Sequence, residues 1–197
     1  MVTRVESAAA TRRALLDAAA ELLDGGGPAA VTLREVGARA GVSRGAPYRH
    51  FADKDSLLTA VAVESWERIG DQVHALRVAP STPVADKLRG ALHLQIGLGR
   101  DRPHLYQMLF RPAPPTAAPA AVVEAAGRFQ AEFLAIVAAL VGERAAGHYG
   151  ALLLTSAHGI TGMELSGHLD TDMWHTSADE LVDTLVRMVA DAGGDAP

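Results

Sequence analysis

The sequence predicts an all-α fold, and two observations carry the prediction. Apolar residues recur at spacings of three and four along most of the 197 residues. No segment alternates apolar and polar residues between turn signals, and aromatic residues make up only 5% of the chain, so strands are not expected. The expected arrangement is a head of three helices followed by a body of about six helices.

The first helix is expected over residues 11–24. Its apolar side chains share one face: Leu15, Ala18, Ala19, Leu22 and Leu23. The triplet Gly25–Gly27 and then Pro28 end it. A phosphate-binding loop would need a strand before the triplet and Gly-Lys-Ser/Thr after it. Neither is present, so the triplet is predicted to end the helix.

Two short helices separated by a glycine turn follow. Thr32 and Glu35 form a capping box that begins the first of them. Gly41 stands where the chain needs a residue tolerant of positive φ. Ser43 is expected to cap the second helix. That helix carries Arg44, Tyr48, Arg49 and His50. Such a pair is a helix-turn-helix, whose second helix enters the major groove of DNA.

This segment resembles the tetracycline-repressor (TetR) family of transcription regulators over roughly residues 11–60. The resemblance rests on three runs: Ala40-Gly41-Val42-Ser43, Tyr48-Arg49-His50-Phe51 and Lys54-Asp55-Ser56-Leu57-Leu58. Two residues depart from the family pattern, Ala46 where many members carry a hydroxyl, and Pro47 where an apolar helix former is usual. The resemblance implies a homodimer that binds double-stranded operator DNA, most often as a repressor released by a small-molecule effector. It implies neither an enzyme nor a cofactor.

Ten residues are predicted to contact DNA: Thr32, Arg34, Ser43, Arg44, Gly45, Ala46, Tyr48, Arg49, His50 and Lys54. Arginine presents a rigid fork of donors that fits guanine or a phosphate. The small Gly45 and Ala46 allow close approach, and Ala46 fits against a thymine methyl. The family resemblance implies that Tyr48, His50 and Lys54 hold the DNA backbone. A solvated basic face is the alternative for any one of these cations.

Charge and composition bound the remaining interpretations. The net charge is −5, but residues 1–58 hold eight basic and seven acidic side chains, and residues 59–197 hold ten and sixteen. A near-neutral head of residues 1–58 that binds DNA and an acidic body of residues 59–197 that does not are therefore expected. The absence of cysteine excludes disulfides and thiolate metal sites. No apolar run approaches about 20 residues and no signal segment is evident, so a cytoplasmic protein without a membrane partner is expected.

The body is expected to contain helices over residues 54–76, 83–98, 103–110, 122–141, 144–168 and 177–192. Asp53 caps the first of them, and Ser177 with Glu180 forms a capping box for the last. Residues 111–119 hold four prolines and are expected to form an irregular connector. The helix over 54–76 follows the head without a flexible linker. An effector that tilts it would change the separation of the two reading heads of a dimer.

Two further sites are predicted in the body. Small residues on the last two helices favour close packing, and the expected dimer interface comprises Leu152, Ser156, Gly159, Ile160, Leu181, Leu185 and Met188. The C-terminal half also resembles a family branch with a Trp-His-Gly-like element, although no tryptophan precedes His158. This resemblance implies an effector cavity lined by Tyr106, Phe110, Phe129, Phe133, His158 and Met163. All of these residues also fit ordinary core packing within one subunit.

Parts of the sequence also fit three other functions. Gly41-Val42-Ser43-Arg44-Gly45 matches the nucleophile elbow of serine hydrolases, but that motif needs a strand before it. A metal-responsive regulator is suggested by His168, Asp170, Asp172 and His175, for which a polar loop is the simpler interpretation. A helical protein-interaction module fits the acidic body but leaves the helix-turn-helix unexplained.

Overall fold

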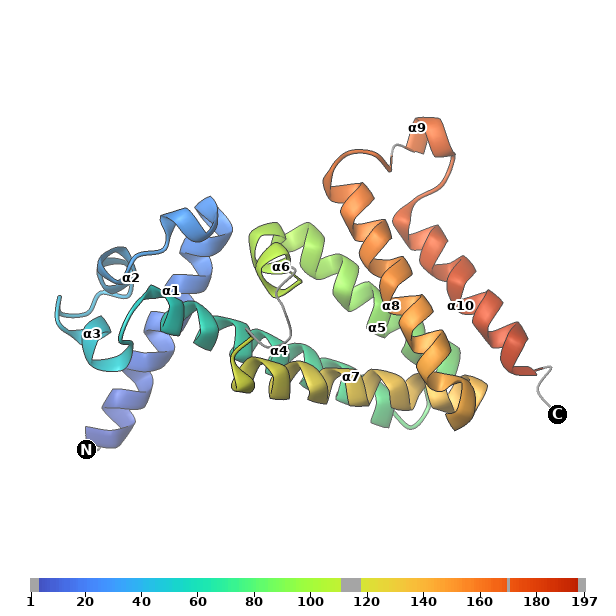
Figure 1. Cartoon of the computed structure of the whole chain (residues 1–197), viewed down its shortest axis with the longest axis horizontal. Helices are drawn as coiled ribbons and strands as arrows, with labels where there is room; N and C mark the ends of the chain where they lie inside the picture. The colour runs from blue at the N-terminus through green and yellow to red at the C-terminus, as the bar shows by residue number, and fades with distance from the viewer. Residues whose placement is uncertain (1–3, 111–117, 170, 195–197) are drawn as a thin grey trace. The chain divides into compact units, whose positions relative to one another are not determined.

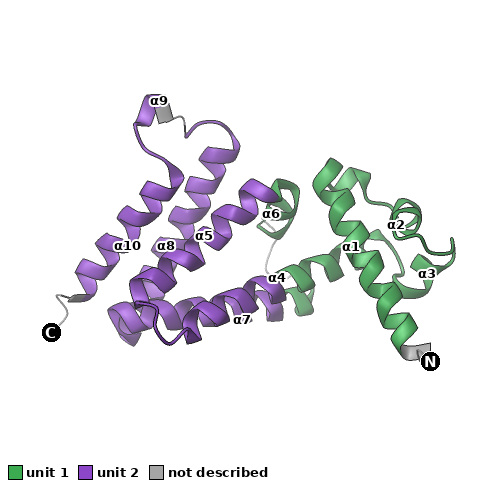
Figure 2. Cartoon of the chain, turned by 180° about the vertical axis from the view of Figure 1, so that it is seen from behind, with its two compact units in different colours: residues 1–65, 102–122 green, residues 66–101, 123–197 purple. Residues whose placement is uncertain are grey.

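The structure is a computed structural model that describes residues 4–110, 118–169 and 171–194. Every regular element in these ranges is a helix, which confirms the predicted all-α class (Figure 1). The chain divides into two compact units (Figure 2). We call residues 1–65 with 102–122 the head unit, and residues 66–101 with 123–197 the body unit. The domain boundary predicted between residues 58 and 59 falls inside α4, a helix that contributes to both units.

The head unit contains α1 (Arg4–Ala30), α2 (Leu33–Arg39), α3 (Ala46–His50), the first half of α4 (Lys54–Val78) and α6 (Pro103–Leu109). Helix α1 begins seven residues before the predicted start, because nothing in residues 4–10 opposes a helix and the Thr11 hydroxyl donates to the Ser7 carbonyl. Its regular part ends at the glycine triplet as predicted. Gly26 and Gly27 leave helical geometry there, and Gly27 takes a φ of 67°.

The packing of α6 against α1 was not foreseen from the sequence. Arg102, just before α6, donates through Nε to Asp24 Oδ2 at 2.6 Å. A Cβ added to Gly27 would lie 3.4 Å from the His104 ring. The helix that follows α5 along the chain therefore belongs to the head unit, held to the end of α1 by an ion pair and a close ring contact.

Helix α4 begins with the cap that the sequence predicts. The Asp53 carboxylate accepts from the Ser56 N–H at 2.7 Å, and the Ser56 hydroxyl accepts from the Asp53 N–H at 3.1 Å. This reciprocal pair satisfies backbone donors that the helix itself leaves open. From there α4 continues without a break to Val78.

The body unit contains the rest of α4, α5 (Val84–Asp101), most of α7 (Ala120–Val141), α8 (Glu143–Leu165), α9 (Thr171–Trp174) and α10 (Ala178–Gly194). Helix α5 packs against α8 and α10. The Arg100 guanidinium fixes all three, because it donates to both carboxylate oxygens of Glu164 and also to Asp179. Between α4 and α7, the rings of Trp66 and Phe129 lie 5.3 Å apart.

Two helix ends in the body differ from the predictions. Helix α8 ends at Leu165, three residues early, because Gly167 adopts a φ of 72° and the His168 N–H turns back to the Met163 carbonyl. The following loop contains the unpredicted short helix α9. The Ser177–Glu180 capping box at the start of α10 is confirmed, since the Glu180 N–H donates to the Ser177 hydroxyl and the Ser177 N–H to the Glu180 carboxylate.

Within the described residues, no single helix is long and apolar enough to cross a membrane. Helices α7 and α8 reach that length and composition only as a pair, and they are bent by 118° relative to each other.

Candidate nucleic-acid interface

The first helix of the helix-turn-helix starts as its sequence predicts. Thr32 has extended backbone geometry, and its Oγ1 accepts from the Glu35 N–H at 3.1 Å. The same hydroxyl still carries its own O–H donor, which remains available to an acceptor outside the protein. Leu33 and Val36 are buried, and they fix this helix on the core of the head unit.

The turn is formed by Gly41, whose φ is 66°. The Gly41 N–H donates to the Ala38 carbonyl, and the Val42 N–H donates to the Gly37 carbonyl at 3.1 Å. These bonds use the carbonyls at the end of α2 and reverse the chain toward α3. The predicted role of Gly41 is confirmed.

The predicted cap of the second helix is wrong. Helix α3 begins at Ala46 with Gly45 at the cap position, and no side chain supplies a capping bond. A helix capped by Ser43 would place Pro47 at its fourth position, where proline removes a needed N–H. By starting later, the chain places Pro47 in the first turn, where proline is tolerated. Arg44 consequently lies in the turn before α3 and not on the helix.

Ala46 also departs from its predicted role. Its side chain is only 2% exposed, since it faces the head core at the start of α3. Pro47 is buried beside it. In this structure the Ala46 methyl is therefore part of the core and is not available to a thymine methyl.

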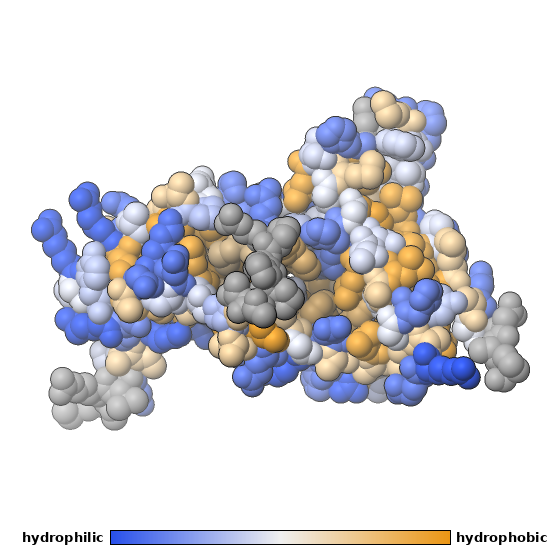
Figure 3. Space-filling model, viewed as in Figure 1, coloured by the Kyte–Doolittle hydropathy of each residue, from blue (hydrophilic) through white to orange (hydrophobic). Residues whose placement is uncertain are grey.

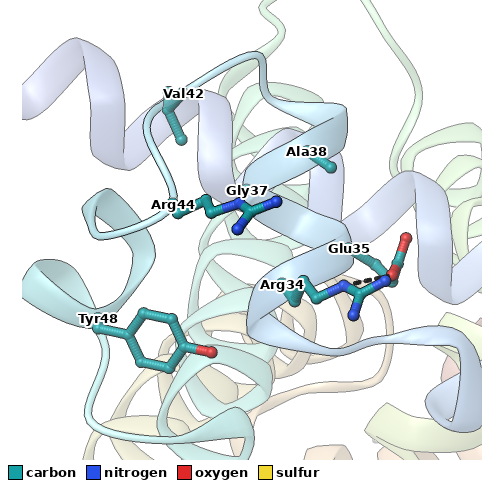
Figure 4. Close-up of a pocket in the computed structure, with 7 residues that line it drawn as sticks. All are labelled: Arg34, Glu35, Gly37, Ala38, Val42, Arg44 and Tyr48. Carbon is teal, nitrogen blue, oxygen red and sulfur yellow. Dashed lines mark ion pairs between the residues drawn. The ribbon is translucent and has the colours of Figure 1, made fainter.

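The exposed side of the helix-turn-helix carries a groove of about 560 Å³. Its lining comes from α2, the turn and α3: Arg34, Glu35, Gly37, Ala38, Val42, Arg44 and Tyr48 (Figure 4). The Tyr48 side chain is 61% exposed. The Arg34 side chain is 87% exposed and lies 3.4 Å from the Glu35 carboxylate, an exposed contact that costs little to exchange for a phosphate.

The two arginines at the second helix are exposed and unneutralised. Among the described residues, no carboxylate forms an ion pair with Arg44 or Arg49. Arg49 lies over Gly45, where an added Cβ would come within 3.6 Å of the guanidinium. Ser43 and Gly45 are exposed on the same segment. This segment therefore presents positive charge with little side-chain bulk, as contact with a polyanion requires.

His50 and Lys54 are less open than the other predicted contacts. His50 is half-buried, and its ring centre lies 6.5 Å from that of Phe51. Lys54 is also half-buried, and its ammonium donates to the Pro28 carbonyl. Lys54 thus links the start of α4 to the end of α1 in addition to any contact it makes with DNA.

Sequence reasoning missed Ala38 and Arg12. Ala38 follows Arg34 by four residues and so shares its helix face, a spacing that would have placed it in the groove. Arg12 lies over the Phe51 ring, with its guanidinium carbon 5.4 Å from the ring centre. No sequence pattern predicts the contact between Arg12 and Phe51, because α1 and Phe51 meet only in the folded head unit.

The structure does not bring the predicted effector-site residues together in one unit. Tyr106 and Phe110 pair their rings at 4.6 Å in the head unit, whereas Phe129 and Phe133 stack in the core of the body unit. His158 and Met163 lie on the exposed side of α8. They do so because α8 turns another face inward, formed by Ala146, Gly150, Leu153, Ala157 and Thr161. The prediction that His158 and Met163 line an interior cavity is wrong for this arrangement.

The predicted dimer residues form an incompletely covered apolar surface on α8 and α10 (Figure 3). Leu152 is 44% and Met188 is 64% exposed. Gly159 is exposed, with no atom within 4 Å of where its Cβ would lie. The remaining four are half-buried: Ser156, Ile160, Leu181 and Leu185.

The geometry does not support the two alternative sites. Ser43 lies in a turn between helices, and the described chain contains no strand on which a nucleophile elbow could be built. His168, Asp172 and His175 form no group placed to hold a metal among the described residues. Asp170 lies outside those residues.

Comparison with known proteins agrees with this arrangement. Residues 15–61 match the family model described as bacterial regulatory proteins, tetR family. Residues 88–189 match the model described as tetracyclin repressor-like, C-terminal domain. The structure is similar to a Rhodococcus sp. RHA1 protein of unknown function, with a TM-score of 0.77, 24% identity and coverage of 92% of this chain and 94% of that one.

Curated relatives match over shorter stretches. An uncharacterized HTH-type transcriptional regulator of Mycobacterium tuberculosis is 30% identical over 101 residues, which is 51% of this chain and 50% of that protein. An HTH-type transcriptional repressor of the same species is 46% identical over 48 residues, 24% of this chain and 26% of that protein. The chain thus spans about half the length of the first relatives it matches. Because the two family models together span both the helix-turn-helix and most of the body, the chain belongs to the TetR family of bacterial regulatory proteins.

Proposed function

We propose that the protein is a homodimeric regulator of transcription that binds operator DNA through the helix-turn-helix and represses the adjacent gene. The observation that carries this proposal is the exposed, unneutralised pair Arg44 and Arg49 beside the groove of α2 and α3. Both guanidiniums are free to contact phosphate or guanine, and the small Gly45 between them lets the backbone approach the duplex. The proposed base readers are Arg44 and Arg49, with Arg34 at the rim.

The remaining contacts are assigned to the DNA backbone. The exposed Tyr48 hydroxyl and the free O–H donors of Thr32 and Ser43 fit phosphate oxygens. His50 and Lys54 fit the same role from half-buried positions. All these groups lie between Thr32 and Lys54 in the head unit.

A dimer supplies the second reading head. Dimeric helix-turn-helix proteins place their two heads about 34–36 Å apart to reach successive major-groove turns. The apolar residues of α8 and α10, including Leu152, Leu185 and Met188, are proposed as the shared surface. Gly159 lies among them with open space over its Cβ position, which lets a partner helix approach closely.

Release by a small-molecule effector acts through α4 in this proposal. The helix is continuous from Lys54 to Val78, so a rearrangement of its C-terminal half is transmitted to the cap at Asp53. An effector with higher affinity for the DNA-incompatible state shifts the population toward that state and lowers operator affinity.

A mobility-shift experiment tests the proposal. The full-length protein is titrated into labelled DNA from upstream of its own gene, with a shuffled fragment of equal length as the control. Specific retardation is expected, and its affinity should fall steeply between about 50 and 200 mM salt because phosphate contacts release counterions. Equal affinity for the two fragments would contradict the proposal.

A further inference from the structure

Gln95 on α5 carries a buried amide that has no hydrogen-bond partner in the described part of the chain. The residue is 5% exposed, and neither its side-chain nitrogen nor its side-chain oxygen reaches a donor or acceptor among the residues that the structure describes. Proteins rarely leave such groups unpaired, because each one has lost its water without gaining a replacement. The Gln95 amide can therefore form hydrogen bonds to a small molecule that enters the core.

Its position on the helix is central. Leu88, Leu92, Gln95 and Gly99 follow at spacings of four, three and four, and all are buried. Gln95 therefore lies in the middle of the inward stripe of α5 and not at its edge, so it cannot turn its amide to solvent. Near the loop between α4 and α5, a Cβ built on Gly90 would lie 3.1 Å from the Leu76 side chain, so the two helices pack closely there.

Among the described residues, Asp24 Oδ1 in the head unit is the one other buried side-chain atom without a partner, and Asp24 still accepts from Arg102 through its other carboxylate oxygen. In the described part of the chain, Ser65, Gln95 and Thr161 are the buried polar residues. The Ser65 hydroxyl donates to the Val61 carbonyl, and the Thr161 hydroxyl donates to the Ala157 carbonyl, each within its own helix. Within the described part of the body unit, Gln95 is the one buried side chain with unused donors and an unused acceptor.

We propose that the Gln95 amide is the polar anchor of the effector site, and that its ligand is an uncharged, largely apolar molecule with an amide-like head. The inference rests on the proposed function and specifies the chemistry of its effector. A primary amide both donates and accepts, so a head that presents a carbonyl next to an N–H matches it in a two-bond pair. Leu88, Leu92 and Ile96 supply apolar surface for the rest of the molecule.

The same surroundings exclude an anionic head. No buried cation lies among the described residues, so a carboxylate at this position would be desolvated without compensation. A neutral amide and the carboxylate of equal chain length therefore distinguish this site from a generic apolar cavity.

Octanamide and octanoate are suitable probes, titrated into the full-length protein by calorimetry and thermal shift. Octanamide is expected to bind wild type and raise its melting temperature, hexanamide should bind more weakly because less apolar surface is buried, and octanoate should not bind. Gln95→Met keeps the volume and removes the orphaned amide. It should raise the melting temperature of the free protein and weaken octanamide binding about tenfold or more.

Thr161→Val is the matched control, because it removes a buried hydroxyl that is already satisfied. It should leave octanamide binding unchanged. The proposal is overturned if octanamide does not bind wild type, if octanoate binds equally well, or if Gln95→Met binds octanamide as wild type does. Gln95→Leu replaces Gln95→Met if the latter does not fold. Mobility shifts on the same samples separate this inference from the proposed function, since Gln95→Met should still retard the operator fragment.

Discussion

The ring of Pro47 packs directly against Gly37. A Cβ built on Gly37 would lie 2.7 Å from Pro47 Cγ, which is closer than two non-bonded carbon atoms can approach. The proline that departs from the family pattern in α3 thus lies against a bare backbone position in α2. This contact fixes the separation of the two helices on which the exposed Arg44 and Arg49 depend.

Gly37→Ala should therefore destabilise the protein although alanine favours a helix. The clash with a rigid buried ring outweighs the gain in helix propensity, and a net loss of about 1–2 kcal/mol in unfolding free energy is expected by chemical denaturation. Adding Pro47→Ala should restore part of the loss, because it removes the ring. Gly147→Ala in α8 has open space and should stabilise. Additive losses in the double variant would show that the contact is not responsible.

Gly41→Ala tests the turn alone. No atom lies within 4 Å of the Cβ position, so the change adds no clash, but the φ of 66° disfavours every residue with a side chain. A loss of about 1–2 kcal/mol is expected. Gly41→Asn should lose less, since asparagine tolerates this region better. Equal stability of the alanine variant and wild type would mean that the turn relaxes to another geometry.

Gly147 and Gly159 offer a matched test of the dimer surface. Both are exposed on α8 with open space over the Cβ position, but only Gly159 lies near Leu152 and Ser156 on the predicted interface. Gly159→Leu should shift the protein toward monomer in sedimentation or light scattering, because the added side chain blocks helix approach. Gly147→Leu should leave the dimer intact. Dissociation by both, or by neither, would locate the interface elsewhere.

The Asp53 cap should make stability depend on pH. The Ser56 N–H and hydroxyl lower the pKa of the Asp53 carboxyl below its ordinary value. With a folded-state pKa below the unfolded one, the stabilisation is complete above the unfolded value of about 3.9 and is lost as pH falls through the folded pKa. Asp53→Asn keeps a capping acceptor without the charge. The difference in melting temperature between wild type and Asp53→Asn should narrow as pH drops below about 4, whereas a constant difference would refute the role of the carboxylate.

The sequence predicted what depends on local chemistry. Capping at Thr32, the glycine turn at Gly41 and the start of α4 at Asp53 all involve residues within three positions of one another, and all are confirmed. The predicted start of α3 was wrong. Pro47 is tolerated only in the first turn of a helix, and this constraint overrides the capping preference of Ser43.

Other features depend on contacts between distant segments. The membership of α6 in the head unit follows from Arg102 and Asp24, which are far apart in sequence. The sequence likewise cannot show that the Gln95 amide is unpaired, because its possible hydrogen-bond partners come from other helices and are known only in the folded chain. His158 was predicted on the inward face of α8 but lies on its exposed face. The prediction failed because a helix rich in small residues shows little apolar periodicity.

Arg44 and Arg49 give the most direct test of the central claim, that the groove face of the helix-turn-helix binds operator DNA. Arg44→Ala and Arg49→Ala, and Arg144→Ala as an exposed control on α8, are titrated against the upstream fragment and its shuffled counterpart. If a head variant loses a base contact, its binding free energy for the upstream fragment should weaken by about 1–3 kcal/mol, and its affinity for the shuffled fragment should change little. One that loses a phosphate contact should weaken both and lower the salt slope by about one. Wild-type affinity in both head variants, with all proteins folded and dimeric, would contradict the account.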